Sequence, residues 1–431
     1  MNSTRTRLAG PCPDEAAVML VALPRCGTPA RSCHGCDDQA MPARVLVTDA
    51  ESRKALAVVR SLGRDFEVST LSSSHISIAG WSRWSRRHHV VPAGDGFEER
   101  VLTLARGNVD IIIAPQEDTI IRLGRQADRF AEAGVKLSFP PLEVLELAFD
   151  KGRTIELART IGMPVPTTRI AANYGEVEDA AEEIGYPLVI KPRHSYYWTG
   201  SDFTLNGGPR YARNIAELRE GLAELDPAQP PPLLQAWVPG TGRGIFALLA
   251  RDGTLSAAFA HQRLRDVHPS GSASVVRSSV PLDPSLLEQA LALLRAMGMW
   301  GIAMVEYRID ARSGQALLLE VNARLWGSIQ LAIDAGVDFP RLLVEVTEGK
   351  TPLVQGYSTD VTLRWWLGDL LRTIRVLRGR PRGFPGTFPG REEALRDFLL
   401  PRPRGMLNEV LRRDDPLPAL GELAWAALMR G

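Results

Sequence analysis

The chain has 431 residues, of which 45% are hydrophobic and 23% are charged, and its formal net charge is +1. This composition is that of a globular protein, long enough for about two or three domains, and a nearly neutral chain offers no general attraction to nucleic acid or to an anionic membrane. The longest apolar runs, such as residues 111–114, fall far short of the roughly 20 residues that span a bilayer, so we expect a cytoplasmic protein without a membrane span.

All four cysteines lie in the first 40 residues, at positions 12, 26, 33 and 36. Cys33 and Cys36 have the spacing of half a zinc site, to which Cys26 would add a ligand, so zinc binding or redox chemistry stays open. The segment is rich in Pro, Gly, Arg and Ala and shows no hydrophobic period. We expect residues 1–40 to form a disordered extension.

Strands and helices alternate over residues 41–145. Strands are predicted at residues 44–48, 66–71 and 109–114, and helices at residues 52–62 and 98–106. The three isoleucines at 111–113 suit a parallel sheet that is covered on both faces. The alternation predicts an open, parallel α/β domain, in which ligands bind beyond the carboxyl ends of the strands.

Residues 81–89 form a short basic and aromatic stretch, with the composition of a nucleic-acid patch. The stretch is isolated in a chain that is nearly neutral, so we interpret it as a surface loop or a contact between domains. We predict no nucleic-acid partner.

Residues 146–350 combine helices with strands of antiparallel character. Helices are predicted at residues 150–161, 176–184, 216–225 and 284–297, and strands at residues 188–192, 233–238, 246–250, 255–262 and 302–307. Another helix begins after Gly327, at residues 328–335. This segment is therefore predicted to be α+β.

Polar residues follow the apolar run at 317–319. Alternation along a strand puts Glu320, Asn322 and Arg324 on one face, and Glu306 lies in another strand-like run. Mg²⁺ prefers carboxylate and amide oxygens, and arginine offers a planar fork that fits phosphate or carboxylate. The pattern indicates a metal–nucleotide site, while polar positions on two half-exposed hairpin strands are the alternative.

Five motifs, in this order and spacing, resemble those of the ATP-grasp superfamily, and within it the ligases related to the large chain of carbamoyl phosphate synthetase. They are Asp150-Lys151, Leu188-Val189-Ile190-Lys191-Pro192, Leu234-Gln235-Ala236-Trp237-Val238-Pro239-Gly240, Val305-Glu306-Tyr307 and Glu320-Val321-Asn322-Ala323-Arg324. Each motif is weak alone, and their combination is specific. The resemblance covers roughly residues 44–350.

The resemblance implies a domain order. Residues 41–145 would form the N-terminal α/β domain on the substrate side, and residues 146–350 a two-lobed ATP-grasp fold with antiparallel sheets. The nucleotide lobe would cover about 150–235, and the metal and catalytic lobe about 236–350.

Residues 351–431 would be a helical extension with a linker rich in Gly, Pro and Arg at 379–391. Its basic and apolar stretch at 364–378 is open to two interpretations. It would either lie on a membrane surface as an amphipathic helix or, as we favour, pack against the catalytic domain.

The resemblance also implies how ATP is bound. Two cations would hold its phosphates, namely Lys151 and Lys191. The adenine would meet the strand at 235–238, with backbone groups of Gln235, Ala236 and Val238 as partners. Trp237 or Ile190 would form a wall of its slot. Residues 193–208, with three glycines, would close over the phosphates as a lid.

The metal and catalytic residues follow from the same resemblance. Glu306, Glu320 and Asn322 would hold Mg²⁺ or Mn²⁺ between the phosphates. Arg324 would be catalytic by facing the transferred phosphoryl group, and Arg265, in the loop 261–265, is a second catalytic candidate on the substrate side. Many relatives carry an acidic ribose-binding residue after the hinge strand, but residues 240–245 contain no carboxylate, so the ribose contact is unassigned.

We therefore expect an ATP-dependent ligase that joins a small carboxylate to a small amine through an acyl phosphate, releasing ADP and phosphate. Two alternatives stay open: phosphorylation of bicarbonate or carbamate, as in carbamoyl phosphate synthetase, and a non-catalytic ATP-binding protein. The sequence leaves a homodimer open and does not name the acid or the amine.

Overall fold

The computed structural model describes residues 42–200, 202–352, 356–401, 403 and 405–428. The expectations for residues 1–40, both the disordered extension and the alternative cysteine chemistry, lie outside the described residues. Within this range, no helix has both the length and the apolar character needed to cross a membrane.

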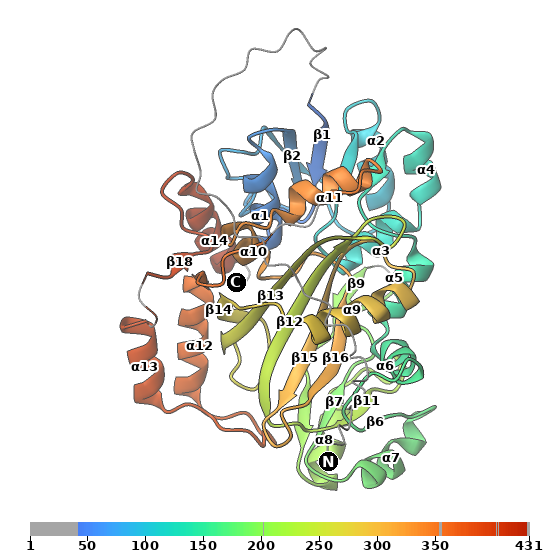
Figure 1. Ribbon diagram of the computed structural model, residues 1–431, viewed down its shortest axis with the longest axis vertical. Helices are drawn as coiled ribbons and strands as arrows, with labels where there is room; N and C mark the ends of the chain where they lie inside the picture. The colour runs from blue at the N-terminus through green and yellow to red at the C-terminus, as the bar shows by residue number, and fades with distance from the viewer. Residues whose placement is uncertain (1–41, 201, 353–355, 402, 404, 429–431) are drawn as a thin grey trace, which may run out of the picture. The chain divides into compact units, whose positions relative to one another are not determined.

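A parallel five-stranded sheet comes first in the chain, with strand order β3-β2-β1-β4-β5 (Figure 1). Its strands are β1 (Arg44–Val47), β2 (Glu67–Ser72), β3 (Arg87–Val90), β4 (Ile111–Ile113) and β5 (Lys136–Leu137), and its helices are α1 (Arg53–Leu62), α2 (Phe97–Ala105), α3 (Glu117–Gly124), α4 (Ala127–Glu132) and α5 (Leu142–Phe149). All three isoleucines of β4 are buried, as a sheet covered on both faces requires. The predicted parallel α/β region is confirmed.

Residues 87–90, at the end of the basic and aromatic stretch, form the edge strand β3, although we expected a surface loop or a contact between domains there. His88 explains part of the difference, because its ring nitrogens lie 2.9 Å from both Thr70 Oγ1 and the Ser74 carbonyl. A residue that looks basic and exposed in the sequence is thus half-buried against β2.

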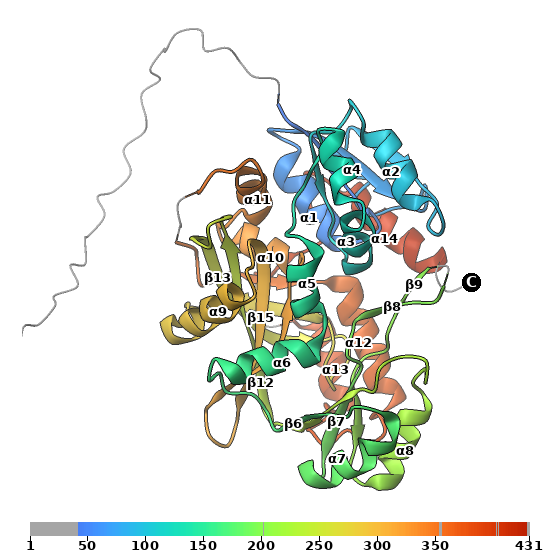
Figure 2. The same ribbon diagram turned by 90° about the vertical axis from the view of Figure 1, so that its right-hand side faces the viewer.

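A small antiparallel sheet follows, with the order β10-β7-β11-β6. Its strands are β6 (Thr168–Ile170), β7 (Leu188–Lys191), β10 (Arg210–Ala212) and β11 (Leu233–Ala236). The helix α6 (Lys151–Thr160) precedes β6, and the helices between the strands are η1 (Tyr174–Glu176), α7 (Val177–Ile184) and α8 (Ile215–Ala223). α7 and α8 lie side by side and share one apolar cluster with β7 and β11 (Figure 2). A two-stranded ribbon, β8 (Tyr196–Trp198) with β9 (Phe203–Leu205), connects β7 to β10.

A seven-stranded sheet forms the centre of the described chain, with the order β16-β15-β12-β13-β14-β17-β18. Its strands are β12 (Gly240–Leu249), β13 (Leu255–Asp266), β14 (Ser274–Ser279), β15 (Gly301–Asp310), β16 (Ala316–Asn322), β17 (Thr362–Arg364) and β18 (Leu407–Asn408), and its associated helices are α9 (Pro284–Ala296), α10 (Ile329–Asp334) and α11 (Phe339–Thr347). All neighbouring pairs are antiparallel except β17 with β18.

Alternate residues of β12 enter different cores, which shows that this sheet is buried on both faces. Ile245 and Leu249 belong to the cluster that contains residues of α5 and α9, whereas Phe246 and Leu248 belong to the cluster that contains residues of α1 and α11. Both cores therefore join the parallel sheet to the central sheet.

The C-terminal extension contains α12 (Trp366–Arg378), α13 (Arg391–Leu399) and α14 (Leu417–Leu428). α12 packs on α13 and β14, and the chain then returns to α1. The Arg60 Nε donates to Asp415 Oδ2 at 2.9 Å, and Arg277 Nη2 is 2.7 Å from Glu409 Oε1. These buried ion pairs fix the extension on the parallel and central sheets.

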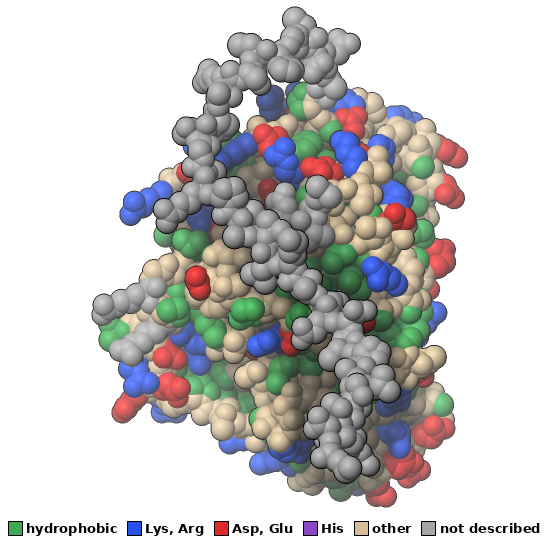
Figure 3. Space-filling view, viewed as in Figure 1, with side chains coloured by type: hydrophobic (Ala, Val, Ile, Leu, Met, Phe, Trp, Pro, Cys, Tyr) green, Lys and Arg blue, Asp and Glu red, His purple; other side chains and the backbone are tan. Residues whose placement is uncertain are grey.

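The surface shown in Figure 3 mixes Lys and Arg side chains with Asp and Glu side chains. This interspersion accords with the net charge of +1.

Candidate active site

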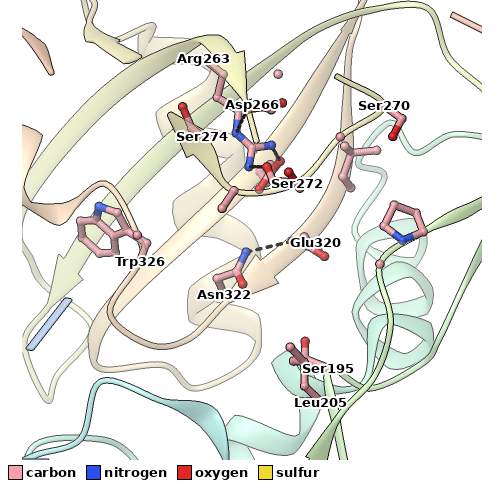
Figure 4. A pocket seen from close by; sticks show the side chains of 18 of the residues that line it. Ser195, Leu205, Arg263, Asp266, Ser270, Ser272, Ser274, Glu320, Asn322 and Trp326 are labelled. Carbon is pink, nitrogen blue, oxygen red and sulfur yellow. Dashed lines mark hydrogen bonds and ion pairs between the residues drawn. The ribbon is translucent and has the colours of Figure 1, made fainter. Parts of the chain in front are cut away.

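One cavity of about 870 Å³ brings most of the predicted residues together (Figure 4). It is lined by the ends of the small sheet, by one face of the central sheet, by residues 51–54 and by parts of the C-terminal extension. The predicted residues on its wall are Lys151, Lys191, Gln235, Ala236, Trp237, Val238, Glu306, Glu320, Asn322 and Arg324.

The pairing of β15 with β16 brings the two acidic candidates together. Glu306 lies directly opposite Glu320, and Met304 lies opposite Asn322. The register shifts next to Glu306, so that Leu319 has no partner in the ladder. Without this bulge, Glu306 would face Leu319, because a slip of one residue exchanges the two faces of a strand.

The carboxyl of Glu320 is buried among cations. Burial opposes its charge, but the ammonium groups of Lys151 and Lys191 outweigh burial and hold the pKa of Glu320 below its ordinary value. Its Oε1 also accepts a hydrogen bond from Asn322 Nδ2 at 3.1 Å. Glu320 is therefore ionised at neutral pH.

Glu306 has a different environment. Burial raises its pKa, against the opposing effect of Arg263. The Nη1 of Arg263 donates to Glu306 Oε1 at 2.5 Å, and its Nη2 donates to the Ser272 carbonyl at 2.8 Å. Arg263 thus occupies one oxygen of Glu306 and leaves the other for a further partner.

The donor set fits a hard divalent cation. Two carboxylates and one amide supply oxygens from adjacent strands, and Mg²⁺ commonly completes its shell with water and phosphate. No group of three or more His, Cys, Asp and Glu residues suited to a metal occurs in the described part of the chain.

Lys191 is held in place by the side chain of Gln235, a residue whose backbone is predicted to contact the adenine. Its Nζ donates to Gln235 Oε1 at 2.7 Å, while Gln235 Nε2 donates to Thr168 Oγ1 at 3.0 Å. The side chain of Gln235 is 2% exposed, so both ends of its amide are used inside the protein. Gln235 therefore positions the lysine.

Lys151 reaches the cavity from the first turn of α6. Asp150 is the N-cap and accepts from the backbone N–H groups of Gly152 and Arg153, which starts the helix at this lysine. The Lys151 Nζ donates to Ser195 Oγ at 3.4 Å, next to the β8–β9 ribbon. Residues of the predicted lid segment 193–208 line the cavity on both sides of this ribbon.

Residues 236–238, at the end of β11 and just after it, use most of their backbone hydrogen-bonding groups within the protein. The N–H of Ala236 donates to the Thr167 carbonyl at 2.8 Å, and the N–H of Trp237 donates to the Pro187 carbonyl at 3.1 Å. The Val238 carbonyl accepts from Arg308 Nε at 3.1 Å. Within the described residues, the N–H of Val238 donates to no protein group.

Three glycines lie on β12, between β13 and β15, and one of them, Gly242, lines the cavity. Gly240, Gly242 and Gly244 alternate along the strand and therefore share one face, opposite residues of β15. A Cβ at Gly244 would lie 3.0 Å from His261 Nε2, and one at Gly242 would lie 3.2 Å from Arg263 Cδ. The alternation of glycines was visible in the sequence, where we noted only the missing carboxylate.

Arg324 and Arg265 have different positions. Arg324 lines the cavity, and its Nε lies 3.8 Å from Glu117 Oε2 at the start of α3. Arg265 does not line the cavity, because its Nη2 is 2.7 Å from the buried Asp369 Oδ2 of α12. The β13–β14 register shifts between Arg263 and Arg265, and the arginine that reaches the acidic pair is Arg263.

The comparisons with known proteins agree with the sequence-based recognition. The model of the family "ATP-grasp in the biosynthetic pathway with Ter operon" matches residues 229–366. The arginine-specific carbamoyl phosphate synthase large chain of Geobacillus stearothermophilus is 26% identical over 209 residues, which are 47% of this chain and 20% of the relative. The large chain of Clostridium acetobutylicum is 24% identical over 255 residues, 57% of this chain and 23% of the relative. The chain thus spans less than a quarter of each curated relative.

Solved structures share the fold at low identity. The biotin carboxylase domain of Hydrogenobacter thermophilus 2-oxoglutarate carboxylase has a TM-score of 0.59 and 19% identity, covering 75% of this chain and 74% of that chain. The N5-carboxyaminoimidazole synthetase of Staphylococcus aureus has a TM-score of 0.58 and 15% identity, covering 74% and 80%. The chain therefore shares the fold of these enzymes, and residues 229–366 match an ATP-grasp family model.

Proposed function

We propose that this protein is an ADP-forming ligase that uses ATP with Mg²⁺ or Mn²⁺ to join a small carboxylate to a small amine. The observation that carries the proposal is the cavity in which Lys151 of α6 and Lys191 of β7 face two carboxylates and an amide of the central sheet. The relationship to ATP-grasp enzymes supports it. The structure of one of them, the biotin carboxylase domain of Hydrogenobacter thermophilus 2-oxoglutarate carboxylase, is a complex with MgADP.

The residues that line the cavity would have separate roles in binding and catalysis. Lys151 and Lys191 would bind the phosphates, and the Val238 N–H would bind the adenine. Glu306, Glu320 and Asn322 would hold the metal, which supplies charge neutralisation at the phosphates. Arg324 would stabilise the phosphoryl group as it passes to the carboxylate.

The proposed chemistry needs no side-chain nucleophile. An oxygen of the acid attacks the γ-phosphorus, the bond to the β–γ bridging oxygen breaks, and ADP leaves. The amine then attacks the acyl carbon, loses a proton and expels phosphate, which gives the amide. The protein contributes positioning and charge stabilisation to both steps.

Relatives named for carbamoyl phosphate synthesis, and a neighbour whose structure contains bicarbonate, favour bicarbonate as a second candidate for the acid. In that case carboxyphosphate would replace the acyl phosphate. Bicarbonate-dependent ADP formation without any amine would support this alternative.

The test is ADP release over a matrix of acids and amines, with mass spectrometry of the products. We expect ADP formation that requires one acid and one amine together, and a product heavier than the acid by the mass of the amine less water. Tight ATP binding without ADP formation across the matrix would contradict the proposal and favour a non-catalytic nucleotide-binding protein.

A further inference from the structure

The cavity extends past the predicted nucleotide and metal residues into a region with three tryptophans. We call this region the tryptophan compartment, and it is lined by Ile78, Trp326, Trp365, Trp425, Glu51 and Glu422. Trp365 precedes α12, and Glu422 and Trp425 belong to α14, so the C-terminal extension forms much of its wall.

Contacts between distant segments hold the compartment together. The guanidinium carbon of Arg53, in the first turn of α1, lies 3.6 Å from the ring centroid of Trp365. The Nε1 of Trp365 donates to Glu422 Oε1 at 2.7 Å. At Gly421, a Cβ would lie 2.9 Å from the Ser77 carbonyl oxygen, so α14 lies close to the segment that carries Ile78.

Two polar groups in the compartment are buried without a partner. Neither Oε2 of Glu51 nor Nε1 of Trp326 has a hydrogen-bond partner in the described part of the chain. The side chain of Trp326 is only 2% exposed. Unpartnered buried groups of this kind are costly, and a ligand would satisfy them.

The nearby cations already have partners. Arg53 forms an ion pair with Glu409. The Nζ of Lys54 donates to the Pro115 carbonyl at 2.7 Å and to Gln116 Oε1 at 2.8 Å. The titratable groups left to face the compartment are therefore the carboxyls of Glu51 and Glu422.

We propose that the tryptophan compartment binds the amine substrate, and that this substrate carries its ammonium group on an apolar or aromatic body. The inference rests on the proposed ligase function and adds the substrate class. Indole faces attract cations and contact flat apolar groups, and the two carboxyls supply the opposite charge. An anionic substrate would instead be repelled by Glu51 and Glu422.

The protonation of the two carboxyls supports the same ligand. Burial, followed by the charge of Asp49, raises the pKa of Glu51 to about 8, and burial raises the pKa of Glu422 to about 7. A bound ammonium would offset the effect of burial and favour the ionised forms. The raised pKa values thus indicate that the protein itself supplies too little positive charge to offset the burial of these two carboxyls.

Two probes that differ in charge test the inference on the full chain. Tryptamine carries an ammonium on an indole, and indole-3-propionic acid carries a carboxylate on the same ring. Calorimetry should show binding of tryptamine and at least about tenfold weaker binding of the acid, because charged hydrogen bonds change affinity on this scale.

Two variants on different segments locate the binding. Glu422→Gln and Glu51→Gln should each weaken tryptamine binding roughly tenfold or more. Leu420→Ala is the matched control, because Leu420 lies on α14 with 57% of its surface exposed, and it should bind tryptamine like wild type. Thermal melting establishes that each variant is folded. If only one glutamine variant folds, its tryptamine affinity is compared with those of the wild type and Leu420→Ala.

Equal affinity for both probes, absence of tryptamine binding, or wild-type binding by the folded glutamine variants would overturn the inference. These measurements need no turnover. Selective tryptamine binding without ADP formation would therefore contradict the ligase function alone, whereas acid- and amine-dependent ADP formation without selective binding would contradict the compartment alone.

Discussion

The two ends of the cavity are built in different ways. At the end that we propose to be catalytic, Glu306, Glu320 and Asn322 lie on two strands joined by a short turn. The cations that compensate Glu320 come from the start of α6 and the end of β7. At the other end, the tryptophan compartment combines Glu51 near the start of the described chain with Glu422 near its end.

The difference shows in the charge of the two ends. Glu320 keeps a lowered pKa because lysines outweigh its burial, whereas Glu51 and Glu422 have raised pKa values because burial dominates. At the first end only Glu320 is compensated in this way, because burial also raises the pKa of Glu306 against the effect of Arg263. An end whose carboxyls lack compensation suits a cation that arrives with the substrate.

Removal of one charge at the catalytic end should have the largest effect. We expect Glu320→Gln and Glu306→Gln each to lower Mg²⁺-dependent ADP formation by roughly a hundredfold or more, since an oxyanion-stabilising group is worth this much. The double variant should be little worse than either single variant, because residues that act as a unit are non-additive.

The matched control is Glu288→Gln, on the exposed face of α9. It should turn over at the wild-type rate in the same ADP-release assay. Near-wild-type turnover by Glu320→Gln at saturating Mg²⁺ would remove the distinction between the two ends of the cavity.

Lys191→Ala should weaken ATP binding by roughly tenfold or more, because charged hydrogen bonds contribute about 1.5–3 kcal/mol. Calorimetry measures this effect without turnover, and the exposed Lys136→Ala is the control. Unchanged ATP affinity in Lys191→Ala would show that this lysine does not meet the phosphates.

Gln235→Met should have a smaller effect of the same kind. It keeps the length of the side chain and removes the acceptor that holds Lys191, so we expect about a threefold to tenfold weaker ATP affinity, in line with the net value of one hydrogen bond. The effect should vanish in the Lys191→Ala background. An equal loss in both backgrounds would indicate that Gln235 acts independently of the lysine.

The substrate end should make stability depend on pH. The pKa values of Glu51 and Glu422 lie above the ordinary carboxyl value of 4.5, so folding favours their protonated forms. Their stabilising contribution is complete below about pH 4.5 and is lost as pH rises through about 7 for Glu422 and about 8 for Glu51.

Urea unfolding at several pH values measures this dependence. The free energy of unfolding should fall between about pH 5 and about pH 8.5, and the slope should be flatter in the double variant Glu51→Gln/Glu422→Gln. Glu288→Gln should follow the wild-type slope. Parallel slopes in all three proteins would indicate that the two carboxyls are not perturbed by burial.

The comparison of the two ends also explains what the sequence revealed. The parallel α/β region, the strands of the central sheet and the Glu-x-Asn-x-Arg pattern depend on periods of two and on short-range order, so the sequence predicts them. Arg263 and Arg265 mark the limit of this reasoning, because the register shift between them and the distant partner Asp369 appear only in the folded chain.

The tryptophan compartment could not be predicted from the sequence for the same reason. Glu51, Trp365 and Glu422 carry no shared spacing, and their proximity depends on contacts such as Arg53 with Trp365 and Gly421 with Ser77. The positioning role of Gln235 was hidden because the motif identifies the residue without the direction of its side chain.

The central claim is that the acidic pair forms a metal–nucleotide site. Its most direct test is to measure Mn²⁺ binding in the presence of ADP by electron paramagnetic resonance. We predict one or two bound Mn²⁺ ions per chain in the wild type, a loss of binding in Glu320→Gln and in Glu306→Gln, and wild-type binding in Glu288→Gln. Mn²⁺ bound as tightly by Glu320→Gln as by the wild type would contradict the claim.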